Sequence, residues 1–214
     1  MTDAPAATSS YYPVSLDLEN RPCLVVGAGP VAARKVRGLL SCGARVSVIA
    51  PDIGEDMRAL ASSLARLEPR AYRPGDVAGF RLVITATGDP AVDGAVADEA
   101  DAAGVWVNSA DDPAHCSFIL PAVHRAGAVT IAVSTGGLSP ALASWLRNQL
   151  AASCGNRLDA LAHLLSEARQ RLRDEGRSSE SVDWAALLDG DLPALVRAGD
   201  DDNAKAILRR ATSA

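Results

Sequence analysis

An apolar, partly β-branched run over Cys23–Val26 stops at a glycine-rich turn, and the residues after the turn are spaced as on an amphipathic helix. The turn, Gly27-Ala28-Gly29-Pro30-Val31-Ala32, matches the pattern G-x-G-x-x-A. In this pattern the first glycine permits a tight turn, the second lets the backbone approach a pyrophosphate, and the alanine keeps helix and strand close. The flanking strand and helix favour dinucleotide binding over a tight turn that holds no ligand.

Strand-like and helix-like segments continue to alternate as far as Asn108. The expected elements, in order, are strand Arg45–Ala50, helix Asp56–Leu67, a short strand Ala71–Arg73, strand Arg81–Ala86, helix Asp89–Ala103 and strand Val105–Asn108. Such alternation is typical of right-handed β-α-β units, and therefore of a parallel sheet covered by helices on both faces. The sequence predicts an α/β fold with a Rossmann-type, NAD-binding parallel sheet over residues 1–113.

Beyond this region the pattern changes to an antiparallel pair and then to helices. Cys116–Val123 and Ala128–Ser134 are strand-like runs separated by a glycine-containing turn, and Ser139 with the following proline predicts the start of a helix. Helical spacing continues to about Arg173, with a break expected at Gly155. Edge strands tend to seek pairing, so we expect residues 114–150 to form a small β-α dimerisation segment and 151–214 a helical C-terminal domain.

Residues after the second and fourth strands extend the predicted dinucleotide site. Pro51 and Asp52 follow the second strand, and Asp52 lies about 20–25 residues beyond the glycines, near the spacing of a carboxylate that binds the ribose 2′-hydroxyl. Its charge would repel a 2′-phosphate, which favours NAD over NADP. A helix-capping role for Asp52 is an equal alternative. Thr87 lies in a loop of small residues that could admit the nicotinamide half or be only a loop.

Two carboxylates, Asp111 and Asp112, follow the strand Val105–Asn108. They are expected at the edge where open α/β sheets bind their ligands. One of them, facing a cleft, could transfer a proton or hold a metal. A turn or capping role before Pro113 is equally open on spacing alone.

The composition excludes several classes of partner. Lys+Arg number 21 and Asp+Glu 26 in 214 residues, a formal charge of −5, which argues against nucleic acid or anionic lipid as the main partner. The longest apolar runs, such as Ala128–Val133, are too short to cross a bilayer, and the first ten residues lack the pattern of a signal peptide. The three histidines and four cysteines have no metal-ligand spacing. We therefore expect a cytoplasmic protein with no membrane partner and no metal site.

Five stretches of the sequence, taken in order, are specific to one family. They are YPVSLDL from Tyr12, VVGAGPVAARK from Val25, VNSAD from Val107, SFILP from Ser117 and STGGLSPALA from Ser134. With them the chain resembles, from Tyr12 to about Leu150, the precorrin-2 dehydrogenase/sirohydrochlorin ferrochelatase family of sirohaem synthesis. The resemblance implies a homodimer that uses NAD to oxidise the tetrapyrrole precorrin-2 to sirohydrochlorin. It also implies, for some members, insertion of iron(II) into sirohydrochlorin.

The resemblance assigns roles by position. It implies that Pro30-Val31 and Pro51-Asp52 contact NAD and that Asp111 is the catalytic aspartate. The family often has N-V-V-D-x-P where this chain has NSADDP from Asn108, so Asp112 is an additional acid. The substrate carries acetate and propionate arms, for which Arg125, Arg147 and Arg157 are candidate partners. Some relatives also carry a methyltransferase domain. We expect that the methyl transfer is carried out by another polypeptide.

Two alternatives stay open at this point. Within the enzyme interpretation, the chain is a dehydrogenase alone (an oxidoreductase) or a dehydrogenase that is also a ferrochelatase (a lyase). In a different class, it is an NAD-binding regulatory module that senses redox state or ligand without catalysis. A short-chain dehydrogenase is excluded, because no tyrosine is followed four residues later by lysine.

Overall fold

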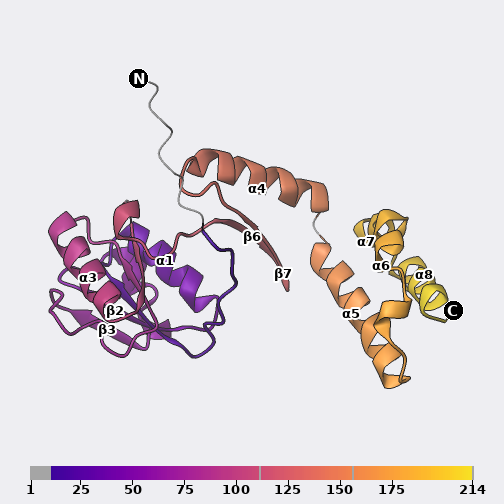
Figure 1. Ribbon diagram of the computed structural model, residues 1–214, viewed down its shortest axis with the longest axis horizontal. Helices are drawn as coiled ribbons and strands as arrows, with labels where there is room; N and C mark the ends of the chain where they lie inside the picture. Colours follow the sequence, from indigo (N-terminus) through magenta and orange to yellow (C-terminus); the bar gives the residue numbers. More distant parts are fainter. Residues whose placement is uncertain (1–10, 111, 156, 214) are drawn as a thin grey trace. The chain divides into compact units, whose positions relative to one another are not determined.

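A computed structural model of the chain describes residues 11–110, 112–155 and 157–213 (Figure 1). The chain divides into two compact units, Met1–Leu120 and Pro121–Ala214. The first unit contains a five-stranded sheet, and the second contains a two-stranded hairpin and a set of helices. The boundaries predicted at residues 113 and 150 stay predictions.

The sheet of the first unit is parallel throughout and has the strand order β3-β2-β1-β4-β5. This is the Rossmann order 3-2-1-4-5-6 without its sixth strand, which confirms the predicted fold class. Val26, the last residue of β1, lies opposite Ile49 of β2 and Thr85 of β4. The loops after these strands therefore meet at one edge. The strands are β1 Pro22–Val26, β2 Arg45–Ala50, β3 Arg66–Pro69, β4 Leu82–Thr85 and β5 Trp106–Ser109.

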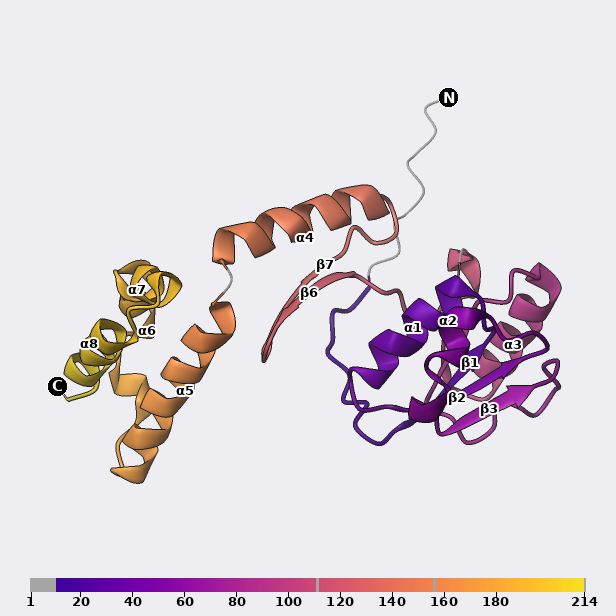
Figure 2. The same cartoon turned by 180° about the vertical axis from the view of Figure 1, so that it is seen from behind.

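Helices cover both faces of this sheet (Figure 2). One face packs on α1 (Pro30–Leu40) and α2 (Glu55–Arg58), and the other packs on α3 (Pro90–Ala102). Within β1, Val25 belongs to the core on the α1 face and Leu24 to the core on the α3 face, and both side chains are fully buried. Burial on both faces explains why the central strands β1 and β4 are nearly continuous apolar runs rather than alternating ones.

The helix predicted over 56–67 and the strand predicted at 71–73 are both wrong. The helix α2 ends at Arg58, a single 3₁₀ turn follows, and the third strand is Arg66–Pro69. Three leucines spaced like a helical stripe, Leu60, Leu64 and Leu67, pack instead against the α1-side core from irregular backbone and from β3. The open edge of β2 takes residues 66–69 as a parallel partner, so tertiary pairing overrides the local spacing.

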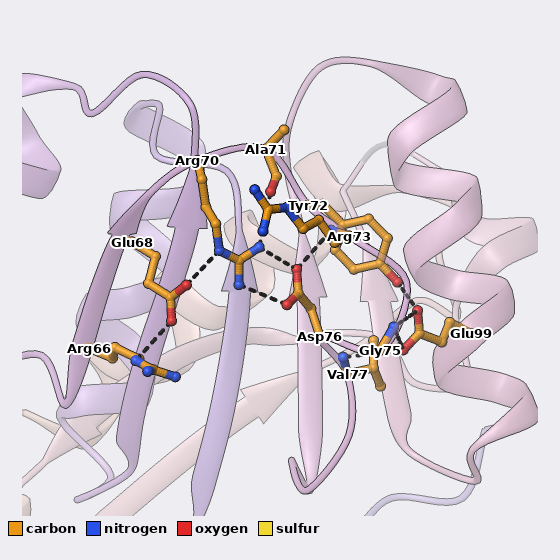
Figure 3. A network of polar contacts seen from close by, with 10 residues as sticks. All are labelled: Arg66, Glu68, Arg70, Ala71, Tyr72, Arg73, Gly75, Asp76, Val77 and Glu99. Atoms are coloured by element: carbon orange, nitrogen blue, oxygen red, sulfur yellow. Dashed lines mark hydrogen bonds and ion pairs between the residues drawn. The ribbon is translucent and has the colours of Figure 1, made fainter.

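The connection from β3 to β4 has no helix in it and is held to the sheet by side chains (Figure 3). Arg70 donates through Nε to Glu68 Oε2 at 2.6 Å and through both terminal nitrogens to Asp76, at 2.6 and 2.7 Å. Glu99 of α3 accepts from the Gly75 N–H at 3.0 Å and from the Tyr72 hydroxyl. Arg70 holds the pKa of Asp76 below its usual value. Burial, and then Glu99, raise the pKa of Tyr72.

The strand predicted over 116–123 is correct only in its last two residues, because β6 begins at Ala122. Residues 116–118 run along β5 instead. The Ser117 N–H donates to Val107 O at 2.9 Å, and the Val107 N–H donates to Ser117 Oγ at 2.7 Å. The Val107 N–H thus bonds a side-chain oxygen instead of a backbone carbonyl, and residues 116–118 do not form a further strand of the sheet. The segment covers the outer edge of β5 and brings Phe118 to the α1-side core.

The second unit begins with the predicted antiparallel pair, β6 and β7. The turn between them is Gly127-Ala128, shorter than predicted, with Gly127 at φ 55°. The helix α4 packs along the hairpin (Figure 1) and begins where predicted, since Ser139 Oγ accepts from the Leu142 N–H at 3.2 Å. The break at Gly155 is confirmed. The elements are β6 Ala122–Ala126, β7 Val129–Val133, α4 Pro140–Cys154, α5 Leu158–Asp174, α6 Trp184–Asp189, α7 Leu192–Ala198 and α8 Asp201–Ser213.

Helices α5, α7 and α8 enclose a small core of their own. Its fully buried members include Ala168 of α5, Leu192 of α7 and Leu208 of α8. Within the described ranges, every helix is too short or too polar to span a lipid bilayer.

Candidate dinucleotide site at the carboxyl edge of the sheet

The first glycine of the motif is fixed by packing inside the protein. Gly27 has φ 111°, and a Cβ atom on it would lie 2.3 Å from the carbonyl oxygen of Ala86 in the β4–α3 loop. Its N–H donates to Ile49 O at 2.9 Å. The β1–α1 turn is therefore pressed against the ends of both neighbouring strands. A glycine is required here whether or not a ligand binds.

The second glycine has no such internal reason. Gly29 is the N-cap of α1 with an ordinary φ of −76°, and a Cβ atom on it would meet no other atom within 4 Å. Pro30 occupies the first helical position, and no side chain caps this helix. The N–H groups of its first turn are therefore left to a ligand or to water. The open space at Gly29 and the uncapped helix end fit the pyrophosphate of a dinucleotide.

The β2–α2 loop lies against the glycine turn. The Gly54 N–H donates to Ala28 O at 3.2 Å, and a Cβ atom on Gly54 would lie 2.7 Å from that oxygen. This contact brings the loop that carries Pro51 and Asp52 beside the motif, with both side chains exposed. The N-cap of α2 is Gly54, and no side chain caps that helix. The helix-capping alternative for Asp52 is therefore wrong.

Sequence reasoning missed Gly54, because a glycine with φ −68° carries no turn signal. Its role is a close approach between two loops 26 residues apart along the chain, from 28 to 54, and no local pattern encodes that approach.

Thr87 organises the loop after β4. Its hydroxyl donates to Asp93 Oδ1 at 2.8 Å and accepts from the Asp89 N–H at 3.0 Å. Asp93, buried in the first turn of α3, also accepts from the Thr87 N–H at 3.1 Å and from the Thr85 hydroxyl. The Thr87 hydroxyl thus has its hydrogen-bond partners within the protein. The predicted cofactor contact at Thr87 would therefore be made by the backbone of the loop, whose conformation the side chain fixes. The sequence does not mark Asp93 as special, because an acidic residue in the first turn of a helix is common.

The predicted catalytic residue, Asp111, lies outside the described residues. Its neighbour Asp112 is the N-cap of the 3₁₀-helix η2 (Pro113–His115), where one carboxylate oxygen accepts from the Ala114 N–H at 3.1 Å. The other oxygen lies 2.7 Å from His115 Nδ1. This pairing raises the pKa of His115 and lowers that of Asp112. The capping interpretation is thereby confirmed for Asp112.

Two of the three arginines considered for the substrate, Arg147 and Arg157, have partners within the second unit. Arg147 donates to Val123 O at 3.0 Å and holds α4 on β6, while Arg157 lies 3.0 Å from Asp201. Among the described residues, no group of three or more His, Cys, Asp or Glu side chains is placed to hold a metal ion.

Comparison with known proteins agrees with this site. Residues 14–122 match the family described as "Putative NAD(P)-binding", and residues 127–153 match the family described as "Sirohaem biosynthesis protein central". The chain belongs to this NAD(P)-binding family.

Among curated relatives, a siroheme synthase of Methylococcus capsulatus is 40% identical over 208 residues, covering 95% of this chain and 44% of the relative. A siroheme synthase of Nitrosomonas eutropha is 37% identical, covering 91% of this chain and 42% of the relative. The chain thus spans less than half the length of these curated relatives. A solved precorrin-2 dehydrogenase structure, 23% identical, covers 95% of this chain with a TM-score of 0.72 and has the same fold.

Proposed function

We propose that the chain oxidises precorrin-2 to sirohydrochlorin with NAD as the oxidant. The observation that carries the proposal is the open space at Gly29 above an uncapped helix N-terminus, at the carboxyl edge of a Rossmann-type sheet. Family membership supports a dinucleotide there, and the siroheme synthase relatives support a tetrapyrrole as the substrate.

The chain's own residues would hold the dinucleotide through backbone and charge. The N–H groups at the start of α1, from Val31 onward beside Pro30, would face the pyrophosphate, and the loop of Pro51 and Asp52 would meet the adenosine ribose. The exposed Asp52 carboxylate would accept hydrogen bonds from the 2′-hydroxyl and repel a 2′-phosphate, which favours NAD over NADP. When bound, NAD supplies an acceptor for a hydride equivalent.

Asp111 would accept the proton that the oxidation releases. The oxidation removes two electrons and two hydrogens from the macrocycle, one leaving as the hydride equivalent and the other as a proton. We assign Asp111 as the acceptor of that proton, because it follows β5 in the sequence, and ligands of open parallel sheets bind at the carboxyl ends of the strands. A positioned acid or base typically contributes about 10²–10⁴-fold in rate.

The active form would be a homodimer built from the second unit. The end of the β7–α4 loop and one side of α4 carry Leu138, Leu142, Trp145 and Leu150, exposed by 74, 47, 57 and 45%. Apolar surface of this kind usually marks an interaction site. A second copy fits it, because β6 and β7 form a two-stranded sheet whose outer edges can pair across a two-fold axis.

The proposal places the protein in the cytoplasm, in keeping with free thiols at Cys23, Cys116 and Cys154. Iron(II), if the chain also inserts it into sirohydrochlorin, would be a substrate of the protein.

One experiment tests the function. The protein is incubated with precorrin-2 and either NAD or NADP, and sirohydrochlorin is followed by its absorbance. A second reaction with sirohydrochlorin and iron(II) or cobalt(II) measures metal insertion over the uncatalysed rate. We expect NAD-dependent formation of sirohydrochlorin. NAD binding without turnover in either reaction would refute the enzyme and favour a sensing module.

A further inference from the structure

The segment after β3 carries an arginine that is bound almost completely by its own neighbours (Figure 3). Arg70 donates through Nε to Glu68, through both terminal nitrogens to Asp76, and through one of them also to Ala71 O at 3.0 Å. A guanidinium has five N–H donors in a fixed fork, so four of the five are engaged here. Little of the hydrogen-bonding capacity of Arg70 is left for a ligand.

Arg70 leaves the sheet beside the loop of the predicted ribose site. Pro69, the last residue of β3, is the register partner of Ala50, the last residue of β2. Arg70 and Pro51 therefore follow two neighbouring strands at the same edge, and neighbouring strands are about 4.8 Å apart. Asp52, which we assign to the ribose 2′-hydroxyl, comes directly after Pro51 and is exposed. An arginine side chain is long enough to reach across one such spacing.

The charges around Arg70 cancel. Glu68 also binds Arg66, at 2.8 Å, so two arginines face two carboxylates, Glu68 and Asp76. Arg66 begins β3, at the far end of the strand, so Arg70 is the arginine of this group at the cofactor edge. Asp76 is also fixed by the backbone, because its Oδ2 accepts from the Arg73 N–H at 2.8 Å. The group thus presents neither a net charge nor a free guanidinium of Arg70 to a bound dinucleotide.

Other contacts hold the same segment to the protein. Glu99 of α3 accepts from the Gly75 N–H at 3.0 Å and from the Val77 N–H at 3.3 Å. The Val77 side chain is fully buried in the α3-side core. Release of Arg70 from one of its carboxylates would therefore leave the segment attached to α3.

We propose that Glu68 and Asp76 determine the choice of cofactor by holding Arg70 away from the dinucleotide, so that Asp52 and the bound Arg70 together exclude a 2′-phosphate. The inference rests on the proposed function, because the ribose site is part of that proposal. In the wild type a 2′-phosphate would meet the Asp52 carboxylate and no available guanidinium. A released Arg70 would supply the bidentate partner that NADP-binding sites use for this phosphate.

The test measures the affinities for NAD and NADP by calorimetry. Asp52→Ala removes the repelling carboxylate and provides the background. Addition of Asp76→Asn, which retains an acceptor for the Arg73 N–H, should raise the affinity for NADP about tenfold and change that for NAD by less than about twofold. Further addition of Arg70→Ala should abolish the gain, because the gain comes from the released guanidinium.

Arg73→Ala is the matched control. Arg73 is an exposed arginine of the same segment, three residues beyond Arg70, and its removal should leave the gain in place. Glu68→Gln frees Arg70 by a second route and should shift the preference in the same direction. The midpoint of thermal unfolding is measured for each variant.

An unchanged affinity for NADP when Asp76→Asn is added would overturn the inference, as would a gain that survives Arg70→Ala or depends on Arg73. If Asp76→Asn unfolds at a much lower temperature, Glu68→Gln carries the comparison. Unfolding of both would show that the ion pairs serve the fold alone, against the inference.

The outcomes also separate the two proposals. A wild type that binds neither dinucleotide would refute the proposed cofactor site, and this inference with it. Preferential binding of NAD by the wild type, with no shift in the variants of Glu68 and Asp76, would leave the proposed function standing and remove only the role of Arg70.

Discussion

The two motif glycines should respond in opposite ways to the same substitution. Gly29→Ala places a methyl group in open space on an ordinary backbone. Reduced freedom of the unfolded chain stabilises by about 0.4–1 kcal/mol, and alanine at an N-cap costs a similar amount. The free energy of unfolding should therefore stay within about 1 kcal/mol of the wild type. The affinity for NAD should fall at least tenfold, about 1.4 kcal/mol, because the methyl group fills the space that the pyrophosphate needs.

Gly27→Ala is the contrasting variant. Its backbone is left-handed, which costs about 1–2 kcal/mol for a residue with a Cβ atom. The clash at 2.3 Å with Ala86 O also forces the two loops apart, at about 1–3 kcal/mol. The free energy of unfolding should fall by about 2–5 kcal/mol, a large part of the stability of an ordinary domain.

Thermal or urea unfolding and calorimetric titration with NAD measure both quantities. Gly29→Val, with a larger side chain, should weaken NAD binding further than Gly29→Ala. A Gly29→Ala variant that binds NAD as tightly as the wild type would refute the reasoning, since the space at Gly29 would then serve no pyrophosphate. Equal loss of stability in Gly27→Ala and Gly29→Ala would contradict the packing argument.

Four further predictions follow from the same features. Asp52→Ala should narrow the preference for NAD over NADP in calorimetry, and tighter binding of NADP than NAD by the wild type would count against the ribose argument. Asp111→Ala should keep near-normal NAD affinity and lose precorrin-2 oxidation by about 10²–10⁴-fold, with Asp112→Ala as the control that retains it. Trp145→Glu should convert dimers to monomers in light scattering, whereas a monomeric wild type at micromolar concentration would remove the dimer. In an NMR titration the pKa of His115 should lie above its ordinary value and fall in Asp112→Asn. Because the folded pKa is raised, the ion pair stabilises η2 below the ordinary histidine pKa, as long as Asp112 stays ionised, and this stabilisation is lost as pH rises through the raised pKa.

The sequence was sufficient for β1, β2, β4 and β5, because these strands are largely apolar segments bounded by glycine, proline or polar loops. It failed between residues 56 and 73, where Leu60, Leu64 and Leu67 have helical spacing but reach the core from other backbone shapes. Helical and irregular segments can both bring residues three or four positions apart to one side of the chain. The pairing of residues 66–69 with the open edge of β2 excludes the helix here.

The candidate site divides in the same way. The glycine motif is local, so its turn and helix were predictable from the spacing. The contacts of Gly54 and Asp93 join residues 6 to 26 positions apart, and their partners are backbone atoms or common side chains.

The two edges of the sheet direct how copies of this chain can associate. On the β5 side, residues 116–118 occupy the outer hydrogen-bonding positions of Val107. On the β3 side, the edge strand has four residues, carries the Arg66–Glu68 ion pair at 2.8 Å and ends in a proline without an N–H. Both features oppose strand addition, the usual route from an open sheet to aggregates. Within the described residues, both edges of the five-stranded sheet are thus protected against edge-to-edge growth, so the strands that carry the predicted cofactor loops are poor templates for aggregation.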